Sequence, residues 1–472
     1  MRPSRREFLK STAAASLGAA GGFICDLSRF NAFAAETSGY KALVCVFLFG
    51  GMDCHDTILP YDTFNYNQYA SLRNSLFDRY EQREGGSTRT REALLPMSLS
   101  NASDFGGRQF AMPPELGPLH QLFEQGACSV VSNVGPLIVP MNREQFRNRS
   151  APRPPRLFSH NDQQSVWMAS QPEGASFGWG GRLADVMLAA NANPDATFTV
   201  VSTSGNTVFL SGQFASQFDM GSQGPREING LGDDRYLGSD ALPQIYESHL
   251  RAQDETLTNI LQRDYSNVVN RSIDANRMLS DSFAQDAPFT TVFPQTRLGR
   301  QLQAVARVIA LRDTIGVRRQ IFFTGIGGFD SHSNQANSIP NRHVEIAEAM
   351  RAFYDTTVEL GVSSDVTSFT ASDFGRTLTI NRDGTDHGWG AHHMVVGDGL
   401  LGSQMVGSFP EPAVGHDLDV NNGRLIPTTS VDQFASTLAN WFGLSNGEVN
   451  DVLPGITNFD QRNLGLFGAT GT

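Results

Sequence analysis

Continuous apolar runs alternate along the chain with segments whose apolar residues recur every three or four positions. The clearest run, residues 41–49, leads into two glycines and is typical of a strand buried on both faces of a sheet. Comparable runs predict strands at 127–134, 197–201, 320–325 and 365–370, with a shorter one at 208–210. Helical spacing is present at 242–281, 298–315 and 343–360.

This order of strands and helices predicts an α/β fold, built on a largely parallel mixed sheet with helices on both faces. In such folds ligands bind beyond the carboxyl ends of the strands. We expect residues 35–472 to form a single domain with long loop insertions, because no repeat or convincing linker divides the chain. The segments 82–91 and 142–156, rich in charge with glycine or proline, are predicted to be such loops.

The first 34 residues have the composition of a removable export signal. Arg5 and Arg6 precede a mild apolar stretch, and Ala32 and Ala34 supply the small residues that a signal peptidase reads. The paired arginines predict export by the twin-arginine translocase to the periplasm or the medium. The apolar stretch is too short for a membrane span, and we expect no span in the mature chain.

Charge and cysteine content narrow the possible partners and folds. The formal net charge is −12, and removing a signal of net charge about +3 leaves the mature chain near −15. Such acidity disfavours binding to nucleic acid or to an anionic membrane. One of the four cysteines leaves with the signal, and Cys45, Cys54 and Cys128 cannot all pair, so we expect no disulfide framework. Cys45 and Cys128 lie in apolar runs and are expected to be buried.

Three short segments hold five of the ten histidines, and each segment also holds carboxylates. Because each of them follows a predicted strand, we expect their side chains to meet at the carboxyl edge of the sheet. Imidazole and carboxylate ligands together suit Zn²⁺, Mn²⁺ or similar ions. The predicted metal ligands are Asp53, Asp330, His332, Asp373 and His387.

Other roles stay open for residues in these segments. Asp330 follows two glycines and could cap the next helix instead of binding a metal. Asp386 could orient His387 from behind. His392 or His393 could supply one more ligand, but not both, because neighbouring strand residues point to opposite faces.

Two residues are candidates for catalysis. Arg376 could hold an anionic substrate bidentately or pair with a carboxylate. Ser159 could act as a nucleophile beside a metal, and its neighbour His160 could be a ligand or a substrate contact. Cys54 is more typical of a small filler residue than of a nucleophile. No Gly-x-Ser-x-Gly sequence surrounds Ser159, and phosphate-loop and dinucleotide-binding glycine patterns are absent from the sequence.

A set of motifs runs in order over essentially the whole mature chain. They are the twin-arginine start, Phe-Leu-Phe-Gly-Gly-Met before Asp53, Phe-Ser-His at 158–160, Gly-Trp-Gly-Gly-Arg at 178–182, Gly-Gly-Phe-Asp-Ser-His-Ser-Asn-Gln at 327–335, Ser-Asp-Phe-Gly-Arg-Thr at 372–377 and Gly-Thr-Asp-His-Gly-Trp-Gly at 384–390. With these motifs the chain resembles DUF1501, a bacterial family of exported proteins.

That family is similar to the alkaline-phosphatase and sulfatase superfamily, which implies a mixed α/β sheet and a site for one or two metals. The resemblance implies Asp53 as the ligand after the first strand and Asp330 with His332 as the middle pair. It implies Asp373 as the late carboxylate and His387 as the closing imidazole. The family more often has Glu in place of Asp373, and the sulfatase sequence Cys/Ser-x-Pro-x-Arg is absent here.

We therefore expect an exported, metal-dependent hydrolase of sulfate or phosphate esters, acting on a small molecule or a polysaccharide. Its cofactor would be one or more divalent metal ions, with zinc, manganese and calcium not distinguished. Attack would come from Ser159 or from metal-activated water, with Arg376 steadying the anion. The alternative is a non-catalytic exported binding or assembly protein that retains the fold.

Overall fold

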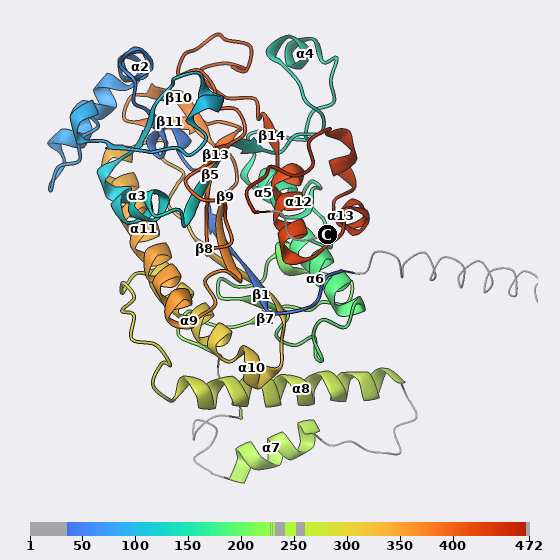
Figure 1. The fold of residues 1–472 in the computed structure, drawn as a ribbon. Helices are drawn as coiled ribbons and strands as arrows, with labels where there is room; N and C mark the ends of the chain where they lie inside the picture. The colour runs from blue at the N-terminus through green and yellow to red at the C-terminus, as the bar shows by residue number, and fades with distance from the viewer. Residues whose placement is uncertain (1–34, 227, 229, 232–240, 252–259, 469–472) are drawn as a thin grey trace, which may run out of the picture.

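The computed structural model describes residues 35–226, 228, 230–231, 241–251 and 260–468, so the predicted export signal lies outside the described residues. Within them the central sheet has the strand order β13-β5-β12-β9-β1-β8-β6-β7, with β14 beside β5 (Figure 1). Its strands are β1 (Lys41–Leu48), β5 (Cys128–Gly135), β6 (Val200–Ser202), β7 (Phe218–Asp219), β8 (Arg319–Ile326), β9 (Val366–Ser372), β12 (Ala391–Val396), β13 (Met405–Val406) and β14 (Thr429–Ser430).

The centre of the sheet is parallel and buried. β1 pairs in parallel with β8 on one side and with β9 on the other, so that Val46 lies opposite Thr324 and Thr370. All of β1 except its first residue is buried, as expected for an apolar run covered on both faces. Since these three strands end together, the loops that follow them leave the sheet at one edge.

The sheet is mixed rather than largely parallel, which corrects that part of the expectation. β12 lies between β9 and β5 and runs antiparallel to both. Two smaller sheets are antiparallel as well. Their strands are β2 (Leu59–Pro60), β3 (Leu95–Pro96) and β4 (Phe110–Met112) in one, and β10 (Arg376–Asn381) and β11 (Gly384–His387) in the other.

Helices cover both faces of the central sheet, as predicted. In Figure 1, α3 (Gly117–Glu124), α9 (Arg297–Ala310) and α11 (Gln335–Glu359) lie on one side. On the other side lie α5 (His160–Ala169), α6 (Trp179–Ala189), α12 (Val431–Phe442) and α13 (Asn446–Val452). Successive side chains of β1 point alternately to the two faces of the sheet, as in any β-strand.

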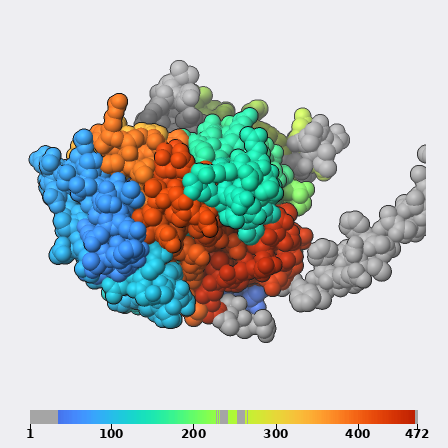
Figure 2. Space-filling view, turned by 90° about the horizontal axis from the view of Figure 1, so that it is seen from above, coloured from blue at the N-terminus to red at the C-terminus, as the bar shows by residue number. Residues whose placement is uncertain are grey.

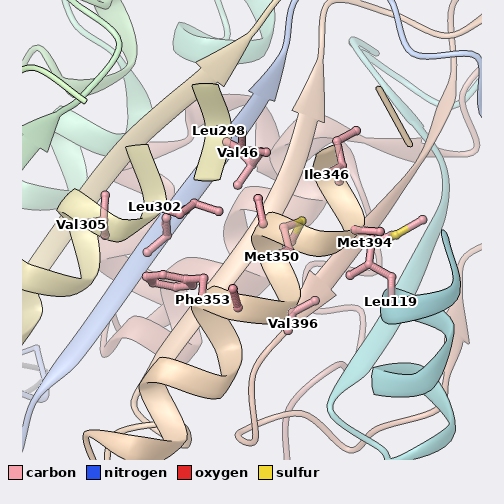
Figure 3. Packing of buried hydrophobic residues seen from close by; sticks show 14 of the residues in the cluster. Val46, Leu119, Leu298, Leu302, Val305, Ile346, Met350, Phe353, Met394 and Val396 are labelled. Atoms are coloured by element: carbon pink, nitrogen blue, oxygen red, sulfur yellow. The ribbon is translucent and has the colours of Figure 1, made fainter. Parts of the chain in front are cut away.

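Each face has its own apolar core. Val46 of β1 packs in the first core with Leu302 of α9 and Phe353 of α11, and Figure 3 shows these side chains gathered over the sheet. The next residue along β1, Phe47, belongs to the second core together with Phe434 of α12. The two cores hold the sheet rigidly beneath the loops at its carboxyl edge.

Several sequence predictions differ in detail from the structure, including the helix predicted at 298–315, which is divided between α9 and α10 (Arg312–Ile315). The predicted helix 242–281 contains α7 (Ala241–Arg251) and α8 (Ile260–Phe283), while 252–259 lie outside the described residues. The predicted strand 208–210 is instead a 3₁₀ turn, η5 (Val208–Leu210), because the Thr207 hydroxyl accepts a hydrogen bond from the Phe209 amide and bends the chain. β12 lies outside the apolar runs that predicted strands, since its two histidines interrupt the apolar pattern, although the alternation argument treated His392 and His393 as strand residues.

The remaining elements connect these layers. They are α2 (Thr63–Gln82), α4 (Arg143–Asn148), α10 (Arg312–Ile315), η1 (Cys54–Asp56), η2 (Arg91–Ala93), η3 (Ala102–Phe105), η4 (Pro114–Leu116) and η6 (Pro454–Asn458). In the described part of the chain, no helix has the length and apolar character needed to cross a membrane.

Candidate metal centre at the carboxyl edge of the sheet

Segments far apart in the sequence meet where β1, β8 and β9 end. The loop after β8 supplies Asp330 and His332, β11 supplies His387, and α5 begins with His160. This edge is the upper end of the sheet in Figure 1, and Figure 2 looks down on that side of the molecule. Of the five predicted ligands, the structure brings Asp330, His332 and His387 together at this edge.

The side chains of His160, His332 and His387 converge on the carboxylate of Asp330. Nε2 of His332 lies 3.2 Å and Nε2 of His387 lies 3.3 Å from its Oδ1 atom. Nε2 of His160 lies 3.7 Å from Oδ2, and the two Nε2 atoms of His332 and His387 are 2.9 Å apart. Among the described residues, His160, Asp330 and His387 form a group whose ligand atoms all lie within 4.8 Å of one another, close enough to hold a metal ion.

Each imidazole in this cluster has its other ring nitrogen fixed by an oxygen acceptor. Nδ1 of His160 donates to Asp373 at 2.6 Å, and Nδ1 of His387 donates to the Phe158 carbonyl at 2.8 Å. Nδ1 of His332 donates to Asp386 at 3.2 Å. A proton held on Nδ1 leaves Nε2 as a bare lone pair, which is how second-shell oxygens prepare histidine for metal binding.

Backbone geometry explains why these side chains can approach so closely. Gly50 has φ +118°, and a Cβ there would lie 2.4 Å from the Asp330 amide nitrogen. A Cβ on Gly384 would lie 2.2 Å from the Ser331 carbonyl oxygen. Phe158 adopts φ +71°, which is costly for a bulky residue. In this conformation the Phe158 carbonyl accepts the hydrogen bond from Nδ1 of His387.

The electrostatics favour the metal-binding forms of Asp330 and His387, whereas the raised pKa of His160 favours the protonated imidazole, which has no lone pair for a metal. Burial alone would raise the pKa of Asp330, but the hydrogen bond and charge of Arg376 outweigh it and hold that pKa below its ordinary value. Burial lowers the pKa of His387, against the opposing hydrogen bond to Phe158. The hydrogen bond to Asp373 raises the pKa of His160, with burial opposing. An ionised carboxylate and a neutral His387 are ligands in the required state.

Asp373, predicted as a ligand, lies behind His160 rather than among the converging atoms. Its side chain is fully buried, and its Oδ2 atom accepts hydrogen bonds from His160, from the Gln164 side chain at 2.9 Å and from the Gly50 amide at 3.2 Å. Its other oxygen, Oδ1, is buried without a hydrogen-bond partner in the described structure. The structure thus places Asp373 where it orients the imidazole of His160.

Asp53 also differs from its predicted place, because the structure does not bring it into the cluster. Both of its carboxylate oxygens bind the guanidinium of Arg73, at 2.6 and 2.9 Å, and both side chains are fully buried. Gln335 donates a further hydrogen bond of 2.6 Å to Asp53. A carboxylate engaged on both oxygens by an arginine is committed to that ion pair.

The two catalytic candidates are occupied by other protein groups. Arg376 is buried, and it contacts Asp330 at 2.8 Å, the Gly50 carbonyl at 3.2 Å and the Thr385 carbonyl. It therefore pairs with a carboxylate, which is the second of the two predicted alternatives. The hydroxyl of Ser159 donates to Asp162 at 2.9 Å, on the helix that Ser159 precedes.

Several other histidines and cysteines prove to be core residues. His392 and His393 are almost fully buried on opposite faces of β12, as strand alternation requires, with His392 stacked on Phe409 and His393 packed against Trp167. Neither has a contact with the cluster among the described residues. Among the described residues, Cys45, Cys54 and Cys128 are free and buried, as expected for Cys45 and Cys128.

Sequence reasoning gave His160 only an open role, and it missed Arg73, Gln335 and Gln164. His160 follows a proline- and arginine-rich loop rather than a strand, so the rule that ligands follow strands does not point to it. The motif Phe-Ser-His at 158–160 was the available signal. Arg73 lies in the middle of α2, whose sequence looks like that of an exposed helix.

Half-exposed side chains make the cluster accessible. The exposed fractions are 46% for Asp330, 45% for His332, 30% for His160 and 21% for His387. Three imidazoles with one carboxylate, open on one side, are a donor set that suits transition ions such as Zn²⁺. A mixed α/β sheet that carries such a set at its carboxyl edge defines an α/β protein with a candidate metal centre.

The chain belongs to the family described as protein of unknown function (DUF1501), whose sequence profile matches residues 40–454. This confirms the family that the motifs indicated. No curated protein sequence matches the chain.

Solved structures show weak overall likeness. The C-terminal periplasmic domain of EcEptC from Escherichia coli, in a complex with Zn, is 10% identical with a TM-score of 0.35, over 88% of this chain and 85% of that chain. The PsFucS1 sulfatase from Pseudoalteromonas sp. is 8% identical with a TM-score of 0.35, over 91% and 73%. The soluble domain of lipooligosaccharide phosphoethanolamine transferase A from Neisseria meningitidis is 9% identical with a TM-score of 0.29, over 92% and 96%. With likeness this low, any function has to be argued from the cluster itself.

Proposed function

We propose that the protein is an exported metal-dependent hydrolase of sulfate or phosphate esters, with a zinc-type ion bound by the cluster. One observation carries the proposal. His160, His332 and His387 each have Nδ1 fixed by an oxygen acceptor, while their Nε2 atoms converge on Asp330. Hydrogen-bonded outer oxygens that orient inner imidazoles are the usual surroundings of a metal site.

The spacing of the imidazoles supports a shared cation. Nε2 of His332 and Nε2 of His387 are 2.9 Å apart. With a proton on each Nδ1, two lone pairs face each other at that distance, and a cation between them would turn repulsion into attraction. Calcium takes six to eight oxygen ligands, so a nitrogen-rich set favours zinc, and after it manganese.

The residues of the cluster have different roles in the proposed ester hydrolysis. A divalent ion held by His160, Asp330 and His387 would act as a Lewis acid toward an ester oxygen and would activate water. Arg376 keeps Asp330 ionised and oriented. Because the Ser159 hydroxyl is directed to Asp162, the contacts support water rather than Ser159 as the nucleophile. The exposed edges of Asp330 and His332 give an ester access from solvent.

An assay of the purified mature protein tests this proposal. After chelation, zinc or manganese is added back, and turnover of 4-nitrophenyl phosphate and 4-nitrophenyl sulfate is followed. We expect activity to return with zinc and to be lost in Asp330→Asn. The matched control is Asp313→Asn, because Asp313 is 86% exposed on α10. Inactivity with every metal contradicts the hydrolase.

A second candidate, a non-catalytic exported binding protein, has one observation in its favour. Both catalytic candidates, Ser159 and Arg376, are engaged by other protein groups. Elemental analysis separates the two functions at the first step. A metal-free protein whose unfolding is unaffected by EDTA supports the binding protein, whereas bound zinc that EDTA removes with loss of stability supports the metal centre.

A further inference from the structure

A short basic segment stands beside the cluster in an otherwise acidic protein. Within residues 147–156, which we call the arginine arm, four of ten residues are arginine and none is acidic, whereas the whole chain has a net charge of −12. The four are Arg147, Arg149, Arg153 and Arg156. Such a local reversal of sign concentrates positive potential at one place on the surface.

The arm is joined to residues beside the candidate metal centre by ring packing and by the chain itself. Phe146, the residue just before the arm, packs on Trp389 with ring centroids 5.7 Å apart, and Arg153 lies over the Phe146 ring at 4.2 Å. Trp389 lies two residues beyond His387. The arm continues into Phe158, whose carbonyl holds His387. In Figure 2 the blue-green atoms of the segment around residue 150 stand beside the orange-red atoms of the later chain.

The charges of the arm are largely uncompensated. Arg147 and Arg149 are exposed, and within the described residues neither they nor Arg153 have an acidic group within 4.0 Å. Arg156 has a 72% exposed side chain and only distant partners, Asp162 at 3.7 Å and Glu173 at 3.9 Å. Arg147 and Arg149 are thus exposed to anions in solvent, and Arg153 and Arg156 are only weakly engaged, by the Phe146 ring and by two distant carboxylates.

We propose that the arginine arm binds additional anionic groups of the substrate, so that the substrate is a carbohydrate chain bearing several sulfate or phosphate esters. Guanidinium groups bind sulfate and phosphate oxygens bidentately. One ester at the cluster needs few of them, and four along an adjoining arm match a substrate with repeated anionic groups. The acidity of the remaining surface disfavours the denser charge of nucleic acid.

This inference rests on the proposed function, because it assigns the arm to the substrate of the same site. The test uses binding, which needs no turnover. Binding of fluorescent dextran sulfate, dextran phosphate, neutral dextran and single-stranded DNA to the chelated mature protein is measured by fluorescence anisotropy at two salt concentrations.

The variants are matched in charge. The arm variant is R147Q/R149Q/R153Q/R156Q, and the control R79Q/R263Q/R271Q/R297Q removes four arginines that are exposed elsewhere. We expect one or both charged dextrans to bind in a salt-dependent way, neutral dextran not to bind, and the arm variant to bind about tenfold more weakly than the control. Should the arm variant fail to fold, R147E/R149E, at two exposed positions, provides the same comparison.

Equal binding by the arm and control variants overturns the proposal, as does binding of neutral dextran or tighter binding of DNA than of either charged dextran. The two charged dextrans identify whether sulfate or phosphate is the group recognised. Turnover of aryl esters without arm-dependent binding contradicts the arm alone. Arm-dependent binding without any ester turnover contradicts the hydrolase alone.

Discussion

The buried Asp373 carboxylate accepts a 2.6 Å hydrogen bond from Nδ1 of His160, and so holds a half-exposed imidazole in one tautomer and one orientation. This contact reverses the order in which the sequence analysis ranked the two residues, since Asp373 was predicted as a ligand and His160 was given only an open role. Asp373, which follows β9, orients the imidazole of His160. His160, which begins α5, faces the cluster. Outer oxygens of this kind strengthen metal binding without touching the metal.

Replacing Asp373 with Asn should weaken zinc binding by about 10- to 100-fold, because the imidazole loses its charged orienting partner. Competition with a zinc chelator measures the change. Asp432→Asn is the control, since Asp432 is a buried carboxylate bonded to Ser170 away from the cluster. An unchanged zinc affinity in Asp373→Asn contradicts the supporting role.

Asp53 should behave as half of a structural ion pair. Removing its charge in Asp53→Asn leaves Arg73 buried without a counter-ion, which costs about 3–5 kcal/mol of unfolding free energy. Urea unfolding gives that value, and elemental analysis of the folded fraction should show the metal retained. Loss of the metal with little loss of stability would instead restore Asp53 as a ligand.

Gln335 links that ion pair to the cluster. Its amide nitrogen donates to Asp53, and its amide oxygen accepts from Thr385 at 2.9 Å and from Ser331, the neighbour of Asp330 and His332, at 3.1 Å. Gln335→Leu leaves these buried groups unpaired, so we expect a loss of about 2–4 kcal/mol and an altered absorption spectrum of bound Co²⁺.

The control for that variant is Gln320→Leu. Gln320 is equally buried and also hydrogen-bonded on both amide atoms, but it lies at the opposite end of β8. It should lose similar stability and keep the Co²⁺ spectrum of the native protein. Identical spectra in both variants mean that Gln335 contributes only to folding.

Buried neutral histidines should make the protein sensitive to acid. Burial lowers the pKa of His393 and of His55 to about 3, with the charge of Arg73 adding to the effect on His55, and it holds the pKa of His392 well below its usual range. As the pH falls through about 6.5, these histidines become protonated in the unfolded chain but stay neutral in the native chain. The unfolding free energy is therefore at its full value above that pH and falls as the pH drops toward 3.

Each such histidine contributes a slope of up to about 1.4 kcal/mol per pH unit. His393→Phe removes one of them, because Phe can keep the packing against Trp167 and Phe434. Unfolding free energies between pH 7 and 4 should show a shallower decline in this variant. An equal slope contradicts a neutral buried His393.

Sequence pattern predicted the fold better than the site. Strands such as 41–49 are recognised from their continuous apolar runs. Asp330, His332 and His387 were found because their segments follow such strands. The pattern failed where side chains have two possible partners. Asp53 and Asp373 look like ligands until Arg73 and His160 reach them, and those contacts depend on how α2 and α5 pack. The search for apolar runs did not find β12, because His392 and His393 are polar residues that are buried in the core.

The zinc content of the mature protein tests the central claim most directly. Elemental analysis of native protein and of Asp330→Ala, after equilibration with zinc and removal of free metal, gives the stoichiometry. We expect about one zinc ion per folded native chain and a loss of that ion in the variant, with the variant still folded. A native protein that retains no metal, or a variant that retains as much as the native chain, would contradict the metal centre.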